Sequence, residues 1–153
     1  MRFVLVLLAL GAGGWLVYAQ VYETGGDRAV AWRDLTTHVG PLRFAKPTKQ
    51  VFTSRRSLSE YLDKLLPGAA PRAPAIDFGR REAVLVAVGP RSSTGYALRI
   101  VRVTERRGSI VVAAREQTPS LGDPVRARLT YPYRLITLPK IDRPVRLELQ
   151  GRP

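Results

Sequence analysis

The N-terminal segment constrains this chain more than any other part of it. Arg2 is its single charged side chain, and an uncharged, mostly apolar run follows from Phe3 to Val21. A cation ahead of such a run is typical of a secretory signal peptide or a membrane anchor. The run also matches the roughly 20 residues that cross a bilayer as a helix. We therefore expect residues 1–21 to be a signal peptide or transmembrane anchor, and the rest of the chain to fold outside the cytoplasm.

Two fates of this segment are open at this point. Retention gives a single N-terminal pass in the cell membrane, and Arg2 on the cytoplasmic side agrees with the positive-inside rule. Cleavage after Ala19 gives a secreted protein, because residues 17–19 are small or moderate in size at the positions that a signal peptidase reads. In either case, residues 22–40 are polar and weakly patterned, so we expect a linker there and a domain at 41–150.

The exported part must be stable without covalent cross-links. Its sequence contains no cysteine, which excludes disulfides, thiolate metal sites and a cysteine nucleophile. A domain of about 110 residues can bury a sufficient core by itself. The formal net charge of the 153 residues is +13, yet the arginines are scattered and not interleaved with aromatic residues. Nucleic-acid binding is therefore not expected.

The sequence of the first half of the expected domain predicts one or two strands and a single helix. A strand or two are expected within 42–53, with Pro47 at an edge or bend. Ser57 and Glu60 then have the spacing of a helical capping box, and Pro67 stops the helical pattern. The apolar residues in between recur at helical spacing: Leu58, Tyr61, Leu62 and Leu65.

The second half predicts strands. Residues 82–89 form a continuous valine-rich run, which is typical of a buried central strand. Residues 125–129 alternate apolar side chains with Arg126 and Arg128, which indicates a half-buried strand. Further strands are expected at 96–104, 110–116, 133–138 and 145–149, and the loop 105–109, which contains Gly108, is expected to join the first two as a hairpin. The predicted fold is mostly β (α+β), an antiparallel sheet or sandwich with one packed helix, preceded by the N-terminal signal or transmembrane helix.

The residues that carry catalysis in other proteins form no recognisable constellation here. His38 is the one histidine, it falls in the expected linker, and no nucleophile motif accompanies it. The carboxylates lack the spacing of a metal loop or of an acid/base pair: Asp63, Asp77, Glu82, Glu105, Glu116 and Asp123. We therefore predict no catalytic residue, no metal and no cofactor, and a small enzyme is the least favoured class of function.

The loop that follows the valine-rich strand is the most distinctive segment. The hydroxyls of Ser93 and Thr94 can close local hydrogen bonds, and Gly95 can supply a positive φ or a close approach. Tyr96 opens a strand whose next same-side residues are apolar, so its ring is expected to face the core. Two interpretations are open: a structural loop, or a recognition loop in which Ser93, Thr94, Gly95 and Tyr96 bind a partner.

The order of several short motifs resembles a known family. Asp77-Phe78 precedes the valine-rich strand and Thr94-Gly95-Tyr96 follows it. The pattern continues with Ile100, Val103, Val112, Glu116, Pro119, Gly122, Val125, Thr130, Pro132, Tyr133 and Pro139. This order is similar to the PrcB C-terminal domain, named for a subunit of a cell-surface protease complex, over about 77–149. Two departures are a single glycine before the tyrosine, where the family usually has two, and the absence of the lipid-anchoring cysteine of many members.

The resemblance implies an exported, non-catalytic accessory or binding domain and brings no catalytic residues with it. Our leading hypothesis is a membrane-tethered extracytoplasmic domain that binds a protein of the cell envelope and assists an envelope protease. The alternative is a basic domain that docks on anionic cell-wall polymer or lipid through Arg126, Arg128 and Arg146. Such docking would weaken with salt, because screening shortens the reach of exposed charges.

Overall fold

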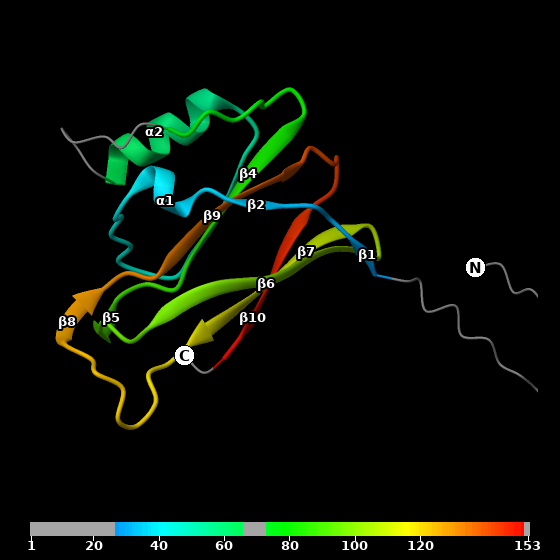
Figure 1. Ribbon diagram of the computed structural model, residues 1–153. Coiled ribbons are helices and arrows are strands. Elements are labelled where there is room, and N and C mark those ends of the chain that lie inside the picture. The colour runs from blue at the N-terminus through cyan, green and yellow to red at the C-terminus, as the bar shows by residue number, and fades with distance from the viewer. Residues whose placement is uncertain (1–26, 66–72, 152–153) are drawn as a thin grey trace, which may run out of the picture.

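Two four-stranded sheets pack face to face, and helices cover the outer face of one of them (Figure 1). The structure is a computed structural model that describes residues 27–65 and 73–151. The expected signal peptide or anchor at 1–21 lies outside these residues. Within the two described ranges, no helix is long and apolar enough to span a membrane.

The strands form two sheets and a separate two-stranded ribbon. Sheet A has the order β1 (Arg28–Ala29), β6 (Ala97–Arg106), β7 (Ser109–Gln117), β10 (Val145–Gln150). Sheet B has the order β2 (Arg33–Asp34), β9 (Tyr133–Pro139), β4 (Arg81–Ala87), β3 (Thr48–Phe52). The ribbon pairs β5 (Arg91–Ser93) with β8 (Ala127–Thr130). The helices are α1 (Thr36–Val39) and α2 (Arg55–Leu65). This mostly β architecture confirms the predicted class.

Strand β4 lies at the centre of sheet B, as its valine-rich sequence predicts. It pairs antiparallel with β3 on one side and β9 on the other. Val84, Val86 and Val88 face sheet A, whereas Ala83 and Leu85 belong to the cluster under the helices. Both faces are therefore buried, which explains why the strand is a continuous apolar run and does not alternate.

Sheet A contains the predicted hairpin and one strand pairing that differs from expectation. β6 and β7 are joined at Arg107 and Gly108, whose φ values of 46° and 73° are both positive, as a type I′ turn requires. β10, however, pairs parallel with β7. Between them the chain passes through β8 and β9, so it leaves sheet A and returns to it in the same strand direction. Such crossovers are what parallel pairs need, and the sheet is mixed where we expected it to be antiparallel.

Residues 27–40, which we expected to belong to a linker at 22–40, are part of the fold, and residues 22–26 lie outside the described residues. The segment forms β1, β2 and α1 and buries Val30, Leu35 and Val39. The hydroxyl of Tyr133 donates to the carbonyl of Gly40, and burial raises the pKa of Tyr133 to about 12. Two-residue strands and a four-residue helix are too short to produce a periodic pattern, which explains why these elements could not be predicted.

Helix α2 is the predicted helix, but its N-terminal cap is Ser54. The Ser54 hydroxyl accepts the Ser57 N–H at 3.2 Å, and the Ser57 hydroxyl donates to the Ser54 carbonyl at 2.9 Å. Glu60 instead pairs with Arg56 at 2.8 Å. The predicted capping box is therefore wrong by one turn, because Ser54 offers an equally good cap earlier in the chain. Leu58 and Leu62 are fully buried as their spacing predicts, and the four-residue α1 is a second helix where one was expected.

Candidate functional site

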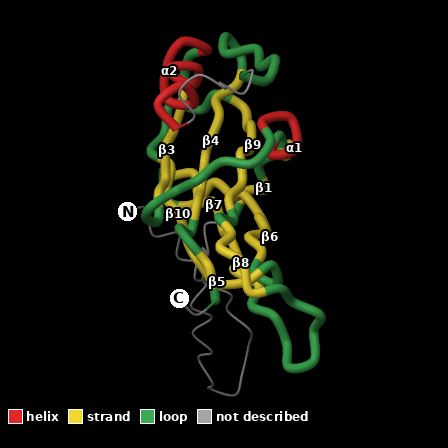
Figure 2. Tube along the Cα trace, turned by 90° about the vertical axis from the view of Figure 1, so that its left-hand side faces the viewer, coloured by secondary structure: helices red, strands yellow, loops and turns green. Residues whose placement is uncertain are grey.

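The ribbon of β5 and β8 continues the central strands of sheet B beyond the sandwich. β4 leads into β5 and β8 leads into β9, and the Val88 N–H donates to the Pro132 carbonyl at 3.2 Å between the two paired stretches. The loop 118–126 joins β7 to β8. We call β5, residues 94–96, this loop and β8 together the ribbon tip. Figures 1 and 2 both show it at the end of the molecule opposite α2.

A buried ion pair holds the ribbon tip to sheet A. Arg91 Nη2 donates to Glu116 Oε2 at 2.9 Å, and its Nε donates to Oε1 of the same carboxylate. The Glu116 side chain is 1% exposed and that of Arg91 is 20% exposed. The hydrogen bond to Glu116 raises the pKa of Arg91. A bidentate pair in this setting is among the stronger charge-assisted contacts, so Glu116 has a structural role.

Hydrogen bonds across the tip hold two of the loop residues singled out in the sequence, Ser93 and Thr94. Thr94 and Arg126 are joined twice: the Arg126 N–H donates to Thr94 Oγ1 at 3.1 Å, and the Thr94 N–H donates to the Arg126 carbonyl at 3.2 Å. The Thr130 hydroxyl donates to the Ser93 carbonyl at 2.7 Å. The Thr94 hydroxyl therefore accepts a hydrogen bond from Arg126, a residue distant in sequence, where we expected a local partner, and this bond ties the two sides of the tip together.

Gly95 allows a close approach and does not adopt a positive φ. A Cβ at this position would lie 2.5 Å from both Pro119 Cβ and Val125 Cγ1, a separation that real Cβ atoms do not show. The loop 118–126 therefore packs directly on the Gly95 backbone, which is one of the two roles expected for this glycine.

Tyr96 does not reach the core position that its sequence neighbours predicted. It is half-buried and belongs to neither hydrophobic cluster, whereas Leu98, two residues later, is fully buried. Paired residues of β6 begin only at Ala97. Tyr96 thus lies just outside the paired part of the sheet, where alternation along a strand no longer decides which side chain is covered.

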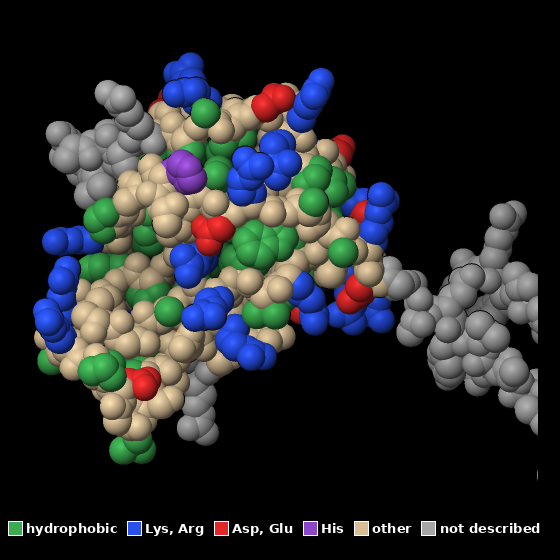
Figure 3. All heavy atoms as spheres, in the orientation of Figure 1, with side chains coloured by type: hydrophobic (Ala, Val, Ile, Leu, Met, Phe, Trp, Pro, Cys, Tyr) green, Lys and Arg blue, Asp and Glu red, His purple; other side chains and the backbone are tan. Residues whose placement is uncertain are grey.

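The outward surface of the ribbon tip is apolar and basic. Val125 is 42% exposed, Leu129 is 58% exposed, and Leu121 is fully exposed. Figure 3 shows hydrophobic side chains standing out at the bottom of the view, where the loop ends. Arg126 and Arg128 are exposed beside them. The expected half-buried strand at 125–129 is therefore wrong: among the residues that the structure describes, β8 pairs with β5 alone, and Val125 and Leu129 are exposed.

Arg146 lies far from Arg126 and Arg128. It is aligned with Val111 of β7, and β7 continues for six more residues to Gln117, after which the loop of the ribbon tip begins. At about 3.3 Å per residue, Arg146 therefore lies about 20 Å along the strand from Gln117. The structure therefore brings Ser93, Thr94, Gly95, Tyr96, Arg126 and Arg128 together at the ribbon tip and places Arg146 elsewhere.

A second feature escaped the sequence analysis. Glu82 on β4 is 5% exposed, and its Oε1 has no hydrogen-bond partner among the described residues. Burial raises its pKa, while the charge of Lys140 partly opposes that rise. The sequence could have revealed this burial. Side chains alternate along a strand, so Glu82 lies on the same face of β4 as Val84, Val86 and Val88, which face sheet A. His38 is exposed on α1, and the described residues contain no cluster of three or more side chains suited to a metal ion.

Comparison with known proteins bears directly on the ribbon tip. Residues 83–139 match the family model described as PrcB C-terminal. Over this segment the chain is similar to the PrcB C-terminal family. The matched part begins in β4 and ends with β9, so it contains the whole ribbon tip and omits the N-terminal elements and β10. Comparisons with curated proteins and with solved structures gave no match.

Proposed function

We propose that this protein is a non-catalytic accessory domain that binds a protein partner through the ribbon tip, within a protease complex of the cell envelope. The observation that carries the proposal is the set of exposed apolar side chains on a tip that a buried ion pair and a tightly packed glycine hold in one conformation. Exposed apolar side chains on one segment of a protein are candidates for an interaction surface. The PrcB C-terminal match is consistent with a protease-complex accessory domain.

The chemistry of the tip specifies what kind of surface it would bind. An apolar contact would cover the three exposed apolar side chains, Leu121, Val125 and Leu129. Acidic groups at the edge of that contact would pair with Arg126 and Arg128. A protein surface with an apolar centre and an acidic rim supplies both. The apolar N-terminal run supports a membrane-tethered, extracytoplasmic location for this contact.

Site-specific photo-crosslinking in intact cells tests the proposal. A photoreactive residue replaces Leu121 in the full chain, and a control chain carries it at Val101, which is also exposed and apolar but lies in β6. We expect one defined protein adduct, containing a protease subunit, from position 121 and not from position 101. Leu129→Ser in the same chain should reduce that adduct. Lipid adducts alone at position 121, or the same adducts from both positions, would contradict the proposal.

One observation favours the alternative function, docking on anionic polymer or lipid. The register of sheet A places four exposed arginines on its outer face: Arg99, Arg102, Arg115 and Arg146. None of the four forms an ion pair with another described residue. Arg99 and Arg115 lie directly opposite each other, an arrangement of like charges that costs stability and that an anionic ligand would relieve.

Binding of the full chain to anionic and neutral vesicles distinguishes this alternative. Docking through the arginine face should weaken steeply as salt rises, because the Debye length falls from about 10 Å at 0.1 M to about 3 Å at 1 M. The double variant Arg102→Gln/Arg146→Gln should lose the binding, and Arg126→Gln/Arg128→Gln should keep most of it. Binding that ignores salt would exclude the alternative.

A further inference from the structure

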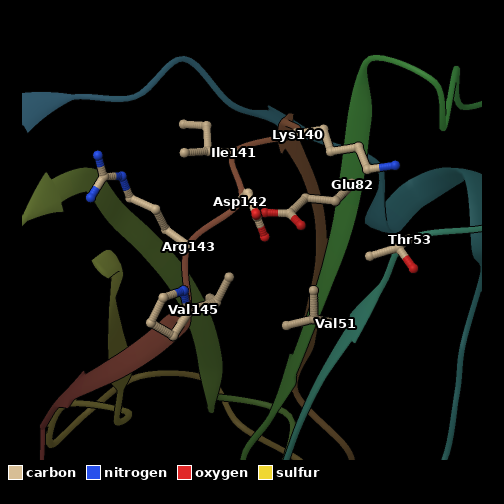
Figure 4. A pocket seen from close by; sticks show the side chains of 9 residues that line it. Val51, Thr53, Glu82, Lys140, Ile141, Asp142, Arg143 and Val145 are labelled. Atoms are coloured by element: carbon tan, nitrogen blue, oxygen red, sulfur yellow. The ribbon is translucent and has the colours of Figure 1, made fainter. Parts of the chain in front are cut away.

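A hollow of about 500 Å³ lies between sheet B and the connection from β9 to β10 (Figure 4). Val51 and Thr53 at the end of β3 form one side, and residues 140–145 form the other. The connection is held in place because the Lys140 N–H donates to the Arg80 carbonyl at 2.8 Å. Much of the lining is aliphatic, from Val51, Ile141, Pro144 and Val145.

Glu82 supplies a carboxylate to this aliphatic hollow. It is 5% exposed, and its Oε1 lacks a hydrogen-bond partner among the described residues. Its parity on β4 is that of the valines facing sheet A. A buried carboxylate with an unpaired oxygen is costly, so the position of Glu82 in the lining of the hollow points to a cationic ligand that offsets its charge.

The neighbouring cations do not satisfy this carboxylate. Arg143 pairs with Glu105 at 2.8 Å, and the Lys49 ammonium donates to the Val145 carbonyl at 2.8 Å. Lys140 is close enough to influence Glu82, yet the two form no ion pair within 4 Å. In Figure 4 the ends of Lys140 and Arg143 point away from the hollow, whereas the carboxylates of Glu82 and Asp142 point toward one another.

We propose that the hollow binds an organic cation, an ammonium or guanidinium group on an aliphatic stem such as a lysine or arginine side chain of a peptide. The cationic group pairs with the carboxylates of Glu82 and Asp142, which both line the hollow, and of the two Asp142 is exposed. The stem packs against Val51, Ile141 and Val145. This site is separate from the ribbon tip, which no residue lining the hollow helps to form.

The lining favours an organic cation over a metal ion. Calcium requires about six to eight oxygen ligands, and the hollow offers two carboxylates among aliphatic side chains. An alkylammonium or alkylguanidinium ion needs a few acceptors for its N–H groups and an apolar surface for its methylenes. The combination of Glu82 with three aliphatic side chains matches both requirements.

The test is an NMR titration of the full chain in mild detergent, followed by amide shifts of residues 51–53 and 140–145. The probes are N-acetyl-lysine methylamide, N-acetyl-arginine methylamide, butylammonium and the uncharged N-acetyl-norleucine methylamide. We expect the cationic probes to shift these amides and the norleucine derivative to leave them unchanged. Equal binding of butylammonium and the lysine derivative assigns recognition to ammonium and stem alone, whereas tighter binding of the lysine derivative assigns it to a peptide.

Two variants make the result decisive. Glu82→Gln should weaken cation binding by about tenfold or more, because a hydrogen bond to a charged group is lost. Glu60→Gln, on the exposed face of α2, should leave the dissociation constant unchanged. Equal binding by Glu82→Gln and the unaltered chain would overturn the proposal. So would equal binding of the norleucine probe, or calcium binding that displaces the amines.

Discussion

Two buried glutamates in this domain have opposite surroundings. Glu116 at the ribbon tip has a bidentate partner in Arg91, and its side chain is 1% exposed. Glu82 beside the hollow is 5% exposed, and its Oε1 has no partner among the described residues. A paired buried charge stabilises the fold, because removing either partner leaves the other charge buried and unpaired. An unpaired buried charge reduces stability, and we attribute its presence here to the binding of a ligand. The contrast gives Glu116 a structural role, holding the ribbon tip in place, and gives Glu82 a role in binding at the hollow.

The largest expected effect on stability comes from removing Arg91, the partner of the buried Glu116. Arg91→Ala leaves a buried carboxylate without its partner, so we expect a loss of about 3–5 kcal/mol in the free energy of unfolding. Urea denaturation of the full chain measures it. Arg56→Ala is the control, because Arg56 pairs with Glu60 in full exposure and its loss should leave the midpoint unchanged. Equal losses in the free energy of unfolding for Arg91→Ala and Arg56→Ala would contradict a structural role for Glu116.

A smaller loss should follow from crowding the loop on Gly95. In Gly95→Ala the new Cβ meets Pro119 and Val125 at 2.5 Å, and both side chains belong to a packed loop. Overpacking of this kind costs about 1–3 kcal/mol. Thermal unfolding should show a lower midpoint than for the control Gly79→Ala, whose Cβ meets only the Asp77 carboxylate, at 3.1 Å. An unchanged midpoint for Gly95→Ala would mean that the tip is not held by this contact.

The pH dependence of stability sharpens the contrast at Glu82. Burial raises the pKa of Glu82, so at intermediate pH the folded chain retains a proton that the unfolded chain has lost. The contribution of this group therefore falls as pH rises from the ordinary glutamate range through the raised pKa. Glu82→Gln resembles the protonated form, so it should be more stable than the unaltered chain at pH 7, with no difference below the ordinary range. Denaturation from pH 3 to 8 checks this, and a constant difference across that range would contradict it.

Much of the fold could be predicted where residues repeat with a clear period. The valine-rich strand β4, the hairpin of β6 and β7, and Leu58 and Leu62 on α2 all followed from pattern. The segment 27–40 could not be predicted, because its elements are two to four residues long. The parallel pairing of β10 depends on a crossover through the other sheet, which no local pattern records.

The candidate sites were predictable only in part. Ser93, Thr94 and Gly95 were singled out because turn-forming residues cluster there, and the family motif includes the same stretch. The exposure of Leu129 could not be predicted, because alternation is the same whether or not a second layer covers the strand. Glu82 could have been found from its parity with Val84, but the missing partner of its Oε1 depends on where the distant residues 140–145 pack.

A single side-by-side measurement tests the central contrast most directly. Glu116→Gln and Glu82→Gln make the same isosteric change, so their free energies of unfolding at pH 7 differ only through their surroundings. We predict opposite signs: Glu116→Gln destabilises the protein, because Arg91 loses its charged partner, and Glu82→Gln stabilises it, because an unpaired buried charge is removed. Destabilisation by both variants would contradict the account, since it would mean that Glu82 has a stabilising partner in the free protein.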